Sequence, residues 1–344
     1  MQFFIRHCEA QERHGNPSRW HQFRDGLGIV IALVLLTLPA HAQAQDYPNR
    51  QVRVLEPLAA ASAVDVVTRL IADRVGHDLG AAFFVDNQPG ASGLLGMRAG
   101  AKAAPDGYTI LAVNDAIVTV LPNMRTDAGY DPRKDFAPIS LLAKLRWVLI
   151  AHSSLPVNNV QEFIAYAKAN PGKVDFGTGG QGSPQHIAME LFMRQAGIQL
   201  THVPFRGVTQ AYTDLVSGHV PVMFIALPAP LAMAADGKVK ILGFAESSRL
   251  PALPDVPTIA EQGMPGFEFS SFAAWMAPAG TPRPIIDKLN AAIKRAVADP
   301  EVNKRLIDYG DLPVASTPEE LAAVIAQDYV AKGELLKAAN IHAD

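Results

Sequence analysis

Short apolar runs alternate with longer amphipathic stretches along most of this chain. Residues 52–55 alternate between two faces as a strand does, and the apolar residues of 64–79 recur at helical spacing. The same order continues with strands expected at 83–85 and 108–113 and a helix near 94–103. This strand–helix order predicts an α/β fold with parallel strands joined by right-handed crossovers.

A second set of strands and helices begins near Val148. Asn159 and Glu162 have the spacing of a capping box, which predicts a helix that ends around Asn170. Further strands are expected at 173–176, 199–203, 220–224 and 239–245, and further helices at 184–196, 208–217, 284–298, 301–309 and 319–338. Because no flexible linker separates the two sets, we expect two lobes around a cleft, with the ligand at the carboxyl ends of the strands.

The glycine-rich turn at 177–182 is the most informative motif of the chain. Gly177, Gly179 and Gly182 have the G-x-G-x-x-G spacing of a dinucleotide-binding turn, and Ser183 with Pro184 forms a good helix start. A nucleotide site also needs an acidic residue about 20 positions later, but residues 200–203 read Leu-Thr-His-Val. The amides of the helix start still favour an anion. The turn therefore predicts an anion site, and a purely structural turn is the alternative.

Two other loops follow strands and precede helices, so their amides are also expected to face the cleft. These loops are 57–62 and 203–207. Arg206 offers a cation in the second loop, although a solvated arginine is an equally good interpretation. Asp65 is expected in the first turn of its helix, where its charge favours the dipole, rather than on the ligand.

Composition and the N-terminal segment restrict the class of protein. The chain has 344 residues and a formal net charge of -3, and it shows no basic stripe typical of nucleic-acid binding. Residues 1–42 resemble an export signal, with Arg19 and Arg24 before an apolar run at 27–38 and a cleavage site at 40–42. That run is shorter than the roughly 20 residues of a membrane span, although a retained anchor is the alternative. Cys8, the one cysteine, falls in this segment, so a periplasmic protein without disulfides or cysteine chemistry is predicted.

The sequence offers no constellation that requires catalysis. Ser183 is explained as a helix cap, and His186 with Glu190 does not complete the His-Glu-x-x-His pattern of a metalloprotease. The remaining histidines of the exported part have no spacing typical of metal ligands. We therefore expect no enzyme activity, no metal and no cofactor.

Several motifs in order resemble the Bug family, the periplasmic receptors of tripartite tricarboxylate transporters. The chain opens with Tyr47-Pro48 after the export signal. The other matching motifs are Asn87-Gln88-Pro89-Gly90-Ala91, Ala104-Pro105-Asp106-Gly107-Tyr108-Thr109, Tyr130-Asp131-Pro132, Asp135-Phe136-Ala137-Pro138, Phe176 to Gly182, His202-Val203-Pro204-Phe205-Arg206-Gly207, Leu253-Pro254-Asp255-Val256-Pro257-Thr258 and Ala277-Pro278-Ala279-Gly280-Thr281-Pro282. Together they cover residues 47–344.

The resemblance implies a two-lobed, type II periplasmic-binding-protein fold, with a mostly parallel, doubly wound sheet in each lobe. It implies one lobe from 47–148 plus 269–344 and the other from 149–268. It also implies a monomer that holds a small carboxylate through loop amides and passes it to membrane permease subunits. The residues expected to contact the ligand are Leu58, Ala59, Ala61, Ser62, Asn114, Thr178, Gly179, Gly182, Ser183, His186, Phe205, Arg206, Gly207 and Ala226.

The chain departs from the family pattern at the cleft. In loop 57–64, Ala61-Ser62 stands where the family usually has a pair of glycines, and Val64 stands where it has a threonine. Val208 stands where a glycine is common in the family, and Ile225 where an acidic residue is frequent. The missing acid predicts a ligand without an ammonium group, with an apolar or aromatic body against Leu58, Phe205 and Ile225. A receptor that feeds a membrane signalling protein, and a hydrolase that uses Ser183 and His186, remain as alternatives.

Overall fold

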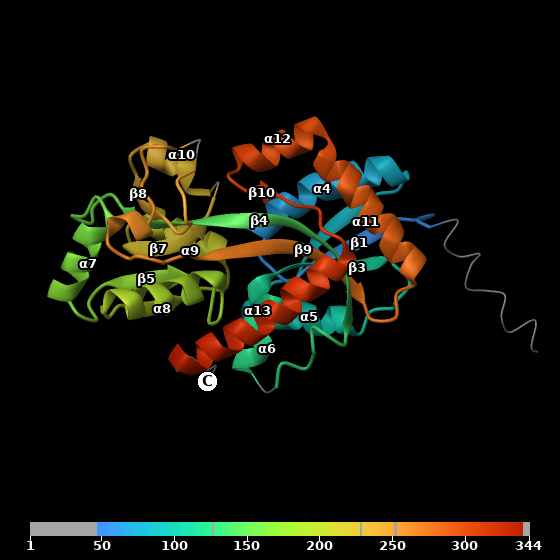
Figure 1. Cartoon of the computed structure of the whole chain (residues 1–344), viewed down its shortest axis with the longest axis horizontal. Helices are drawn as coiled ribbons and strands as arrows, with labels where there is room; N and C mark the ends of the chain where they lie inside the picture. Colours follow the sequence, from blue (N-terminus) through green and yellow to red (C-terminus); the bar gives the residue numbers. More distant parts are fainter. Residues whose placement is uncertain (1–46, 126, 228, 251–252, 340–344) are drawn as a thin grey trace, which may run out of the picture. The chain divides into compact units, whose positions relative to one another are not determined.

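Two long antiparallel strands, β4 (Phe136–His152) and β9 (Ser270–Pro278), run through the centre of the fold (Figure 1). The computed structural model describes residues 47–125, 127–227, 229–250 and 253–339. The expected export signal and Cys8 lie outside the described residues. Residues 136–146 of β4 pair with β9, whereas residues 147–152 pair with β7 (Val222–Ala226) and β8 (Val239–Phe244). Strand β4 therefore belongs to both halves of the sheet.

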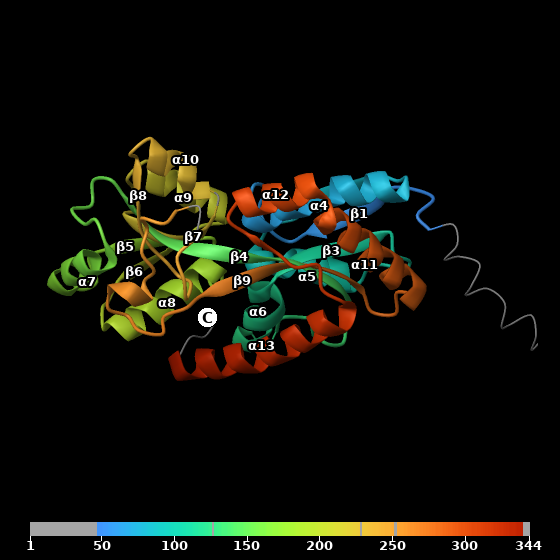
Figure 2. The same ribbon diagram turned by 45° about the horizontal axis from the view of Figure 1, so that its top comes forward.

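The first half of the sheet contains the predicted parallel strands. Strand β1 (Val52–Glu56) lies between β2 (Phe83–Asn87) and β3 (Thr109–Asn114), parallel to both, and β3 then pairs antiparallel with β9. The helical segments of this half are α4 (Ala63–Leu79), η1 (Ala91–Gly93), α5 (Leu94–Ala101), η2 (Ala116–Val120), α6 (Leu121–Met124), α11 (Arg283–Ala298), α12 (Pro300–Asp308) and α13 (Pro318–Ala339). A short strand, β10 (Leu312–Pro313), pairs with β4. In Figure 2, α4 and α12 cover one face of this half, and α6 and α13 cover the other.

The second half has a similar organisation. Strand β5 (Asp175–Thr178) is parallel to β6 (Thr201–Pro204) and to β7. Its helical segments are α7 (Val160–Ala169), α8 (Pro184–Ala196), α9 (Val208–Val216), α10 (Ala229–Ala235) and η3 (Ala260–Gln262). The complete sheet has the order β2-β1-β3-β9-β4-β7-β5-β6. No helix of the described residues has both the length and the apolar character needed to cross a bilayer.

The structure confirms the α/β class and the βαβ order in both halves, and helix α8 has the predicted bounds. The sheet is mixed, however, because β4 and β9 run antiparallel to their neighbours. The sequence pattern does not indicate these two strands. β4 and β9 pair with each other across more than a hundred residues of sequence, and Lys144 and Arg146 interrupt the apolar run of β4 where the two halves meet.

A stack of aromatic rings from β5, β6 and α8 lies next to the glycine turn. His202 of β6 stacks on both Phe176 of β5 and His186 of α8, with ring centroids 4.9 Å and 4.1 Å apart. The amide of Gly182 donates to His186 Nδ1 at 3.2 Å, and Thr178 Oγ1 lies 2.6 Å from His202 Nε2. Burial and the neighbouring His186 lower the pKa of His202 to about 4, because a charged ring is poorly solvated here. The turn therefore rests on a ring stack in which His202 is neutral near pH 7.

This stack predicts a loss of stability in acid. As the pH falls from neutral toward 4, the unfolded chain binds a proton at residue 202 while the folded protein does not, so the free energy of unfolding decreases. We expect a decrease of roughly 1–2 kcal/mol from this group, after allowance for its partial solvent contact. Urea unfolding at pH 7 and pH 4.5 should show that His202→Gln removes this part of the pH dependence. His219→Gln, a change at an exposed histidine, should leave the pH dependence of the unfolding free energy unchanged. If His202→Gln shows the same difference in unfolding free energy between pH 7 and pH 4.5 as wild type, the prediction is contradicted.

Candidate functional site

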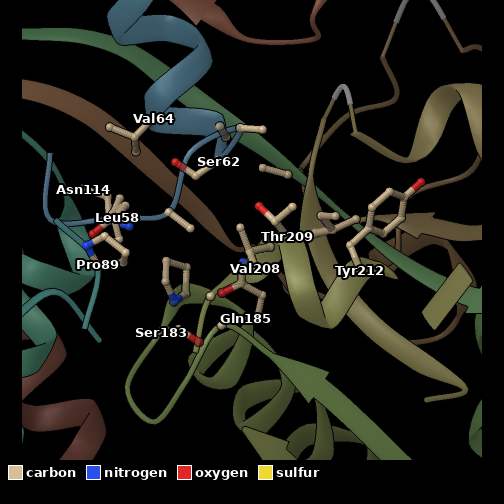
Figure 3. A pocket seen from close by; sticks show the side chains of 18 of the residues that line it. Leu58, Ser62, Val64, Pro89, Asn114, Ser183, Gln185, Val208, Thr209 and Tyr212 are labelled. Carbon is tan, nitrogen blue, oxygen red and sulfur yellow. The ribbon is translucent and has the colours of Figure 1, made fainter. Parts of the chain in front are cut away.

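A cavity of about 370 Å³ lies where loops from both halves of the sheet meet (Figure 3). From the first half, the loops after β1 and β2 and the end of β3 contribute Pro57, Leu58, Ala59, Ala61, Ser62, Ala63, Val64, Val66, Pro89, Gly90, Ser92, Gly93 and Asn114. From the second half, the segments at and after the ends of β5, β6 and β7 contribute Gly179, Ser183, Pro184, Gln185, Arg206, Gly207, Val208, Thr209, Tyr212, Ile225, Ala226, Leu227 and Ala229. Side chains of Leu145 and Trp147 from β4 complete the lining. The cavity is therefore at the carboxyl ends of the parallel strands, where the sequence predicts a ligand.

Most of the candidate ligand residues line this cavity. They are Leu58, Ala59, Ala61, Ser62, Asn114, Gly179, Ser183, Arg206, Gly207 and Ala226. Thr178, Gly182, His186 and Phe205 are not among the lining residues. Their neighbours in the chain face the cavity, but these four have other partners.

The four residues outside the lining hold the turn in place. Thr178 is fully buried against His202, and His186 belongs to the ring stack. Gly182 has φ +72 and packs against Met124, whose sulfur would lie 2.8 Å from an added Cβ. Phe205 packs on the hydrophobic cluster formed by α9, β7 and β8, so the expectation that it contacts the ligand body is not supported by its position. Loop membership alone does not tell which side of a turn a residue faces.

Other lining residues were not identified from the sequence. They include Pro89, Ser92, Trp147, Gln185, Val208, Thr209 and Tyr212, of which Val208 is noted there as a departure from the family pattern. Ile225, which was predicted from the sequence to lie against the ligand body, also lines the cavity. One signal was present: Val208 and Tyr212 are four residues apart, so they share one face of α9 directly after the 203–207 loop. Trp147 gave no such signal, because its position depends on the pairing of β4 with β7.

The lining is almost free of formal charge. Among the described lining residues, Arg206 is the one charged side chain, and it is exposed. Asn114 is 5% exposed, and its Oδ1 accepts a hydrogen bond from the amide of Ile117 at 3.1 Å, which leaves the Nδ2 donors for the cavity. Tyr212 donates to the carbonyl of Ala229 at 3.0 Å, and burial raises its pKa to about 12, so the phenol stays neutral. The neutral Nδ2 group of Asn114 can therefore donate to an anion in the cavity, whereas the Tyr212 hydroxyl proton is already used by Ala229.

Three helices begin at the cavity. Ser62 caps α4 by accepting from the amide of Asp65 at 3.2 Å, and Ser183 caps α8 as predicted, with the amide of His186 at 3.5 Å. Helix α9 begins after Gly207 without a side-chain cap, so its first amides remain available. The positive ends of the three dipoles favour negative charge in the cavity.

Asp65 lies in the first turn of α4, as predicted, and holds the loop before it. Its carboxylate accepts from the amide of Ala61 at 2.9 Å, from Asn87 Nδ2 at 3.0 Å and from Arg69 Nε at 2.9 Å. Burial opposes its charge, but these hydrogen bonds outweigh that effect and lower the pKa of Asp65. They also hold Ala61 at φ +60, a conformation that disfavours a Cβ atom. Asp65 is thus satisfied within the protein.

Close contacts join loops of the two halves around the cavity. Ser92 Oγ donates to the carbonyl of Gln181 at 2.7 Å, and Thr209 Oγ1 donates to the carbonyl of Ala60 at 2.9 Å. Gly207 lies so near Ala59 that an added Cβ would come within 2.9 Å of the alanine methyl group. The loops therefore enclose the cavity from both sides.

No group of three or more His, Cys, Asp or Glu side chains in the described ranges is arranged to hold a metal ion. The cavity itself presents neutral donors, backbone amides and apolar walls. Its chemistry suits binding of an organic anion.

Comparison with known proteins agrees with this geometry. A family model described as the tripartite tricarboxylate transporter family receptor matches residues 67–341. A UPF0065 protein of Bordetella bronchiseptica is 35% identical over 327 residues, which cover 94% of this chain and 96% of that protein.

Solved structures show the same fold. The periplasmic binding protein BugD is 32% identical with a TM-score of 0.83, over 86% of this chain and 99% of BugD. An R. palustris protein solved with adipate is 31% identical with a TM-score of 0.84, over 86% of this chain and 99% of its own. MatC from Rhodopseudomonas palustris, with bound malate, is 33% identical with a TM-score of 0.80, over 84% and 100%. The chain therefore belongs to the receptor family of tripartite tricarboxylate transporters, the Bug family, and has the two-lobed periplasmic-binding-protein fold that its motifs predicted.

Proposed function

We propose that this protein captures a small carboxylate in the cavity and delivers it, without chemical change, to the membrane permease of a tripartite tricarboxylate transporter. The observation that carries the proposal is a cavity of neutral donors and helix starts in which no described lining residue is acidic. Two similar structures, one solved with adipate and the other with bound malate, support a carboxylate ligand. The protein would act in the periplasm as a monomer after removal of residues 1–42.

One ligand carboxylate would lie among the starts of α4, α8 and α9. Ser62, Asn114, Ser183 and the amides after Gly207 are the proposed donors. Hydrogen bonds to a charged group contribute roughly 1.5–3 kcal/mol each. Because micromolar binding needs about 8 kcal/mol, several such donors suffice without an arginine clamp.

The remainder of the ligand would be apolar. Leu58, Val64 and Ile225 present hydrocarbon to the cavity, and Trp147 does the same because its Nε1 donates to Ser271 Oγ at 2.9 Å. An ammonium group would have no described carboxylate in the lining to pair with, and burying an unpaired charge is costly. We therefore infer a carboxylate with an apolar or aromatic body and no amino group.

Hydrolysis is not supported by the arrangement of Ser183 and His186. The Ser183 hydroxyl accepts from the amide of His186, and His186 Nδ1 accepts from the amide of Gly182. The ring nitrogen that a base would use is therefore engaged elsewhere. A nucleophile needs a base within hydrogen-bond reach, so we propose binding rather than catalysis.

Ligand capture would involve closure of two lobes, 47–148 plus 269–344 and 149–268, about the strands β4 and β9. The hydrogen bonds of Ser92 and Thr209 cross between these lobes and would form on closure. A ligand that contacts both lobes would favour the closed form.

The first prediction concerns ligand class. A thermal-shift screen should show stabilisation by succinate, glutarate, adipate or benzoate, and weaker effects from aspartate and glutamate. A ligand at 100 times its Kd adds about 2.7 kcal/mol, or roughly 5–10 °C. Stronger stabilisation by the amino acids than by succinate and glutarate would overturn the ammonium-free class. No shift from any carboxylate would count against the receptor function.

The second prediction concerns Asn114. Asn114→Asp keeps the Oδ1 that accepts from Ile117 but replaces the Nδ2 donors with negative charge beside the ligand. We expect the affinity for the stabilising carboxylate to fall at least about tenfold, which corresponds to the loss of one charged hydrogen bond. Asn170→Asp, outside the cavity lining, is the matched control. Calorimetric titration that gives equal affinities for wild type and Asn114→Asp would remove Asn114 from the proposed site.

The third prediction concerns the contacts between lobes. Thr209→Val with Ser92→Ala removes both crossing hydroxyls and leaves the cavity walls nearly unchanged. We expect a faster dissociation rate and an affinity weaker by about tenfold or less. Thr213→Val is the control, because that hydroxyl donates within α9 to the carbonyl of Thr209. Unchanged dissociation in the double variant would show that these bonds do not hold the closed form.

A further inference from the structure

A buried glutamate lies directly behind the cavity. Glu56 is the last residue of β1, and its side chain is fully buried at 0% exposure. Its Oε1 lies 3.1 Å from Ser62 Oγ, whereas its Oε2 has no hydrogen-bond partner. Ser62 itself lines the cavity. A single hydroxyl therefore separates this carboxyl group from the proposed ligand.

Glu56 differs from the neighbouring Asp65 in how its charge is compensated. Asp65 has Arg69, Asn87 and the amide of Ala61, but Glu56 has one hydroxyl. Burial raises the pKa of Glu56 well above its usual range, and the charge of Asp65 raises it further, against smaller opposing effects of Ser62 and Arg69. Asp65 and Arg69, both on α4, are the charged groups of the described chain that act on Glu56. The neutral acid is therefore the favoured form.

The protonation of Glu56 decides what Ser62 presents to the cavity. A serine hydroxyl has one proton and two acceptor lone pairs, and the amide of Asp65 occupies one lone pair. When Glu56 is ionised, its carboxylate accepts the hydrogen bond from the Ser62 hydroxyl, so Ser62 has no donor for a ligand and a negative charge lies behind it. When Glu56 is protonated, it donates to Ser62, and the Ser62 proton is free to point into the cavity.

We propose that Glu56 is a positioning residue whose protonated form turns Ser62 into a donor for the ligand carboxylate, so that carboxylate binding is coupled to a proton held by Glu56. This inference rests on the proposed receptor function. At a pH where the unliganded Glu56 is ionised, binding of the anion takes up one proton from solvent, which remains on Glu56 until the ligand leaves. The protein would then bind its ligand more tightly in acid than in alkaline solution.

The test compares the pH dependence of binding in matched variants. Calorimetric titrations with benzoate and adipate from pH 5 to pH 9, in buffers of different ionisation enthalpy, measure both the Kd and the number of protons taken up. For wild type we expect the affinity to fall by up to about tenfold per pH unit above the pKa of Glu56, with proton uptake that approaches one per ligand. Glu56→Gln should retain the acid-side affinity throughout this range, with uptake near zero from this site.

Two comparisons separate this effect from other causes. Glu334→Gln makes the same chemical change at an exposed position and should behave as wild type. Asp115 follows Asn114, and burial raises its pKa to about 7, but its titration would persist in Glu56→Gln. An unchanged pH profile in Glu56→Gln would therefore overturn the inference.

Ser62→Gly provides an independent readout if Glu56→Gln folds poorly. Glycine is a tolerated N-cap and costs only a few tenths of a kcal/mol relative to serine. We expect this variant to lose about tenfold in affinity at pH 5.5 and less at pH 9, to the extent that ionised Glu56 already accepts the Ser62 hydrogen bond in wild type. An equal loss at both pH values would contradict the coupling. If no carboxylate binds to wild type at any pH, the proposed function fails; if binding occurs without these differences, only the coupling fails.

Discussion

The sharing of strand β4 between the two halves of the sheet is the constraint on which the cavity depends. One end of β4 pairs with β9 and the other end with β7 and β8, so a single strand fixes both halves in one sheet. The parallel strands of each half end on the same side, at loops 57–62, 177–182 and 203–207. Because these loops lead into α4, α8 and α9, the starts of three helices face one volume. The site is thus a consequence of the crossing strand rather than of any single motif.

The electrostatics of the cavity follow from how the protein treats its buried acids. Asp65 keeps its charge because Arg69, Asn87 and a backbone amide surround it, and its role is to hold loop 57–62. Glu56 has no comparable set of partners and is favoured as the neutral acid. Neither residue therefore opposes an anion in the cavity with a full, uncompensated charge. In surroundings of low polarity, oriented amides and hydroxyls are effective at holding a carboxylate.

The sequence predicted the local features well, since they depend on near neighbours. Local sequence encodes Ser183 and Pro184 at the start of α8, Asp65 in the first turn of α4, and the βαβ order. Strands β4 and β9 are not visible in this way, because each is defined by pairing with strands far away in the sequence. For the same reason Trp147 gave no signal as a lining residue.

Local sequence patterns also could not predict which side of a turn faces the cavity. His186 and Phe205 lie in the predicted loops or helix start, yet one joins a ring stack and the other packs on the α9 cluster. Glu56 shows the converse. As a charged residue at a strand end it gave no sign of burial, which arises only when α4 and the loop after β1 close over it.

The most direct measurement of the central claim is native mass spectrometry of the protein after equilibration with a mixture of carboxylic acids and amino acids. We expect one small carboxylic acid per chain, without an amino group, released intact when the protein is denatured. A protein that stays empty in this mixture, or that selects an amino acid or a cation, would contradict a cavity built to hold a carboxylate with neutral donors.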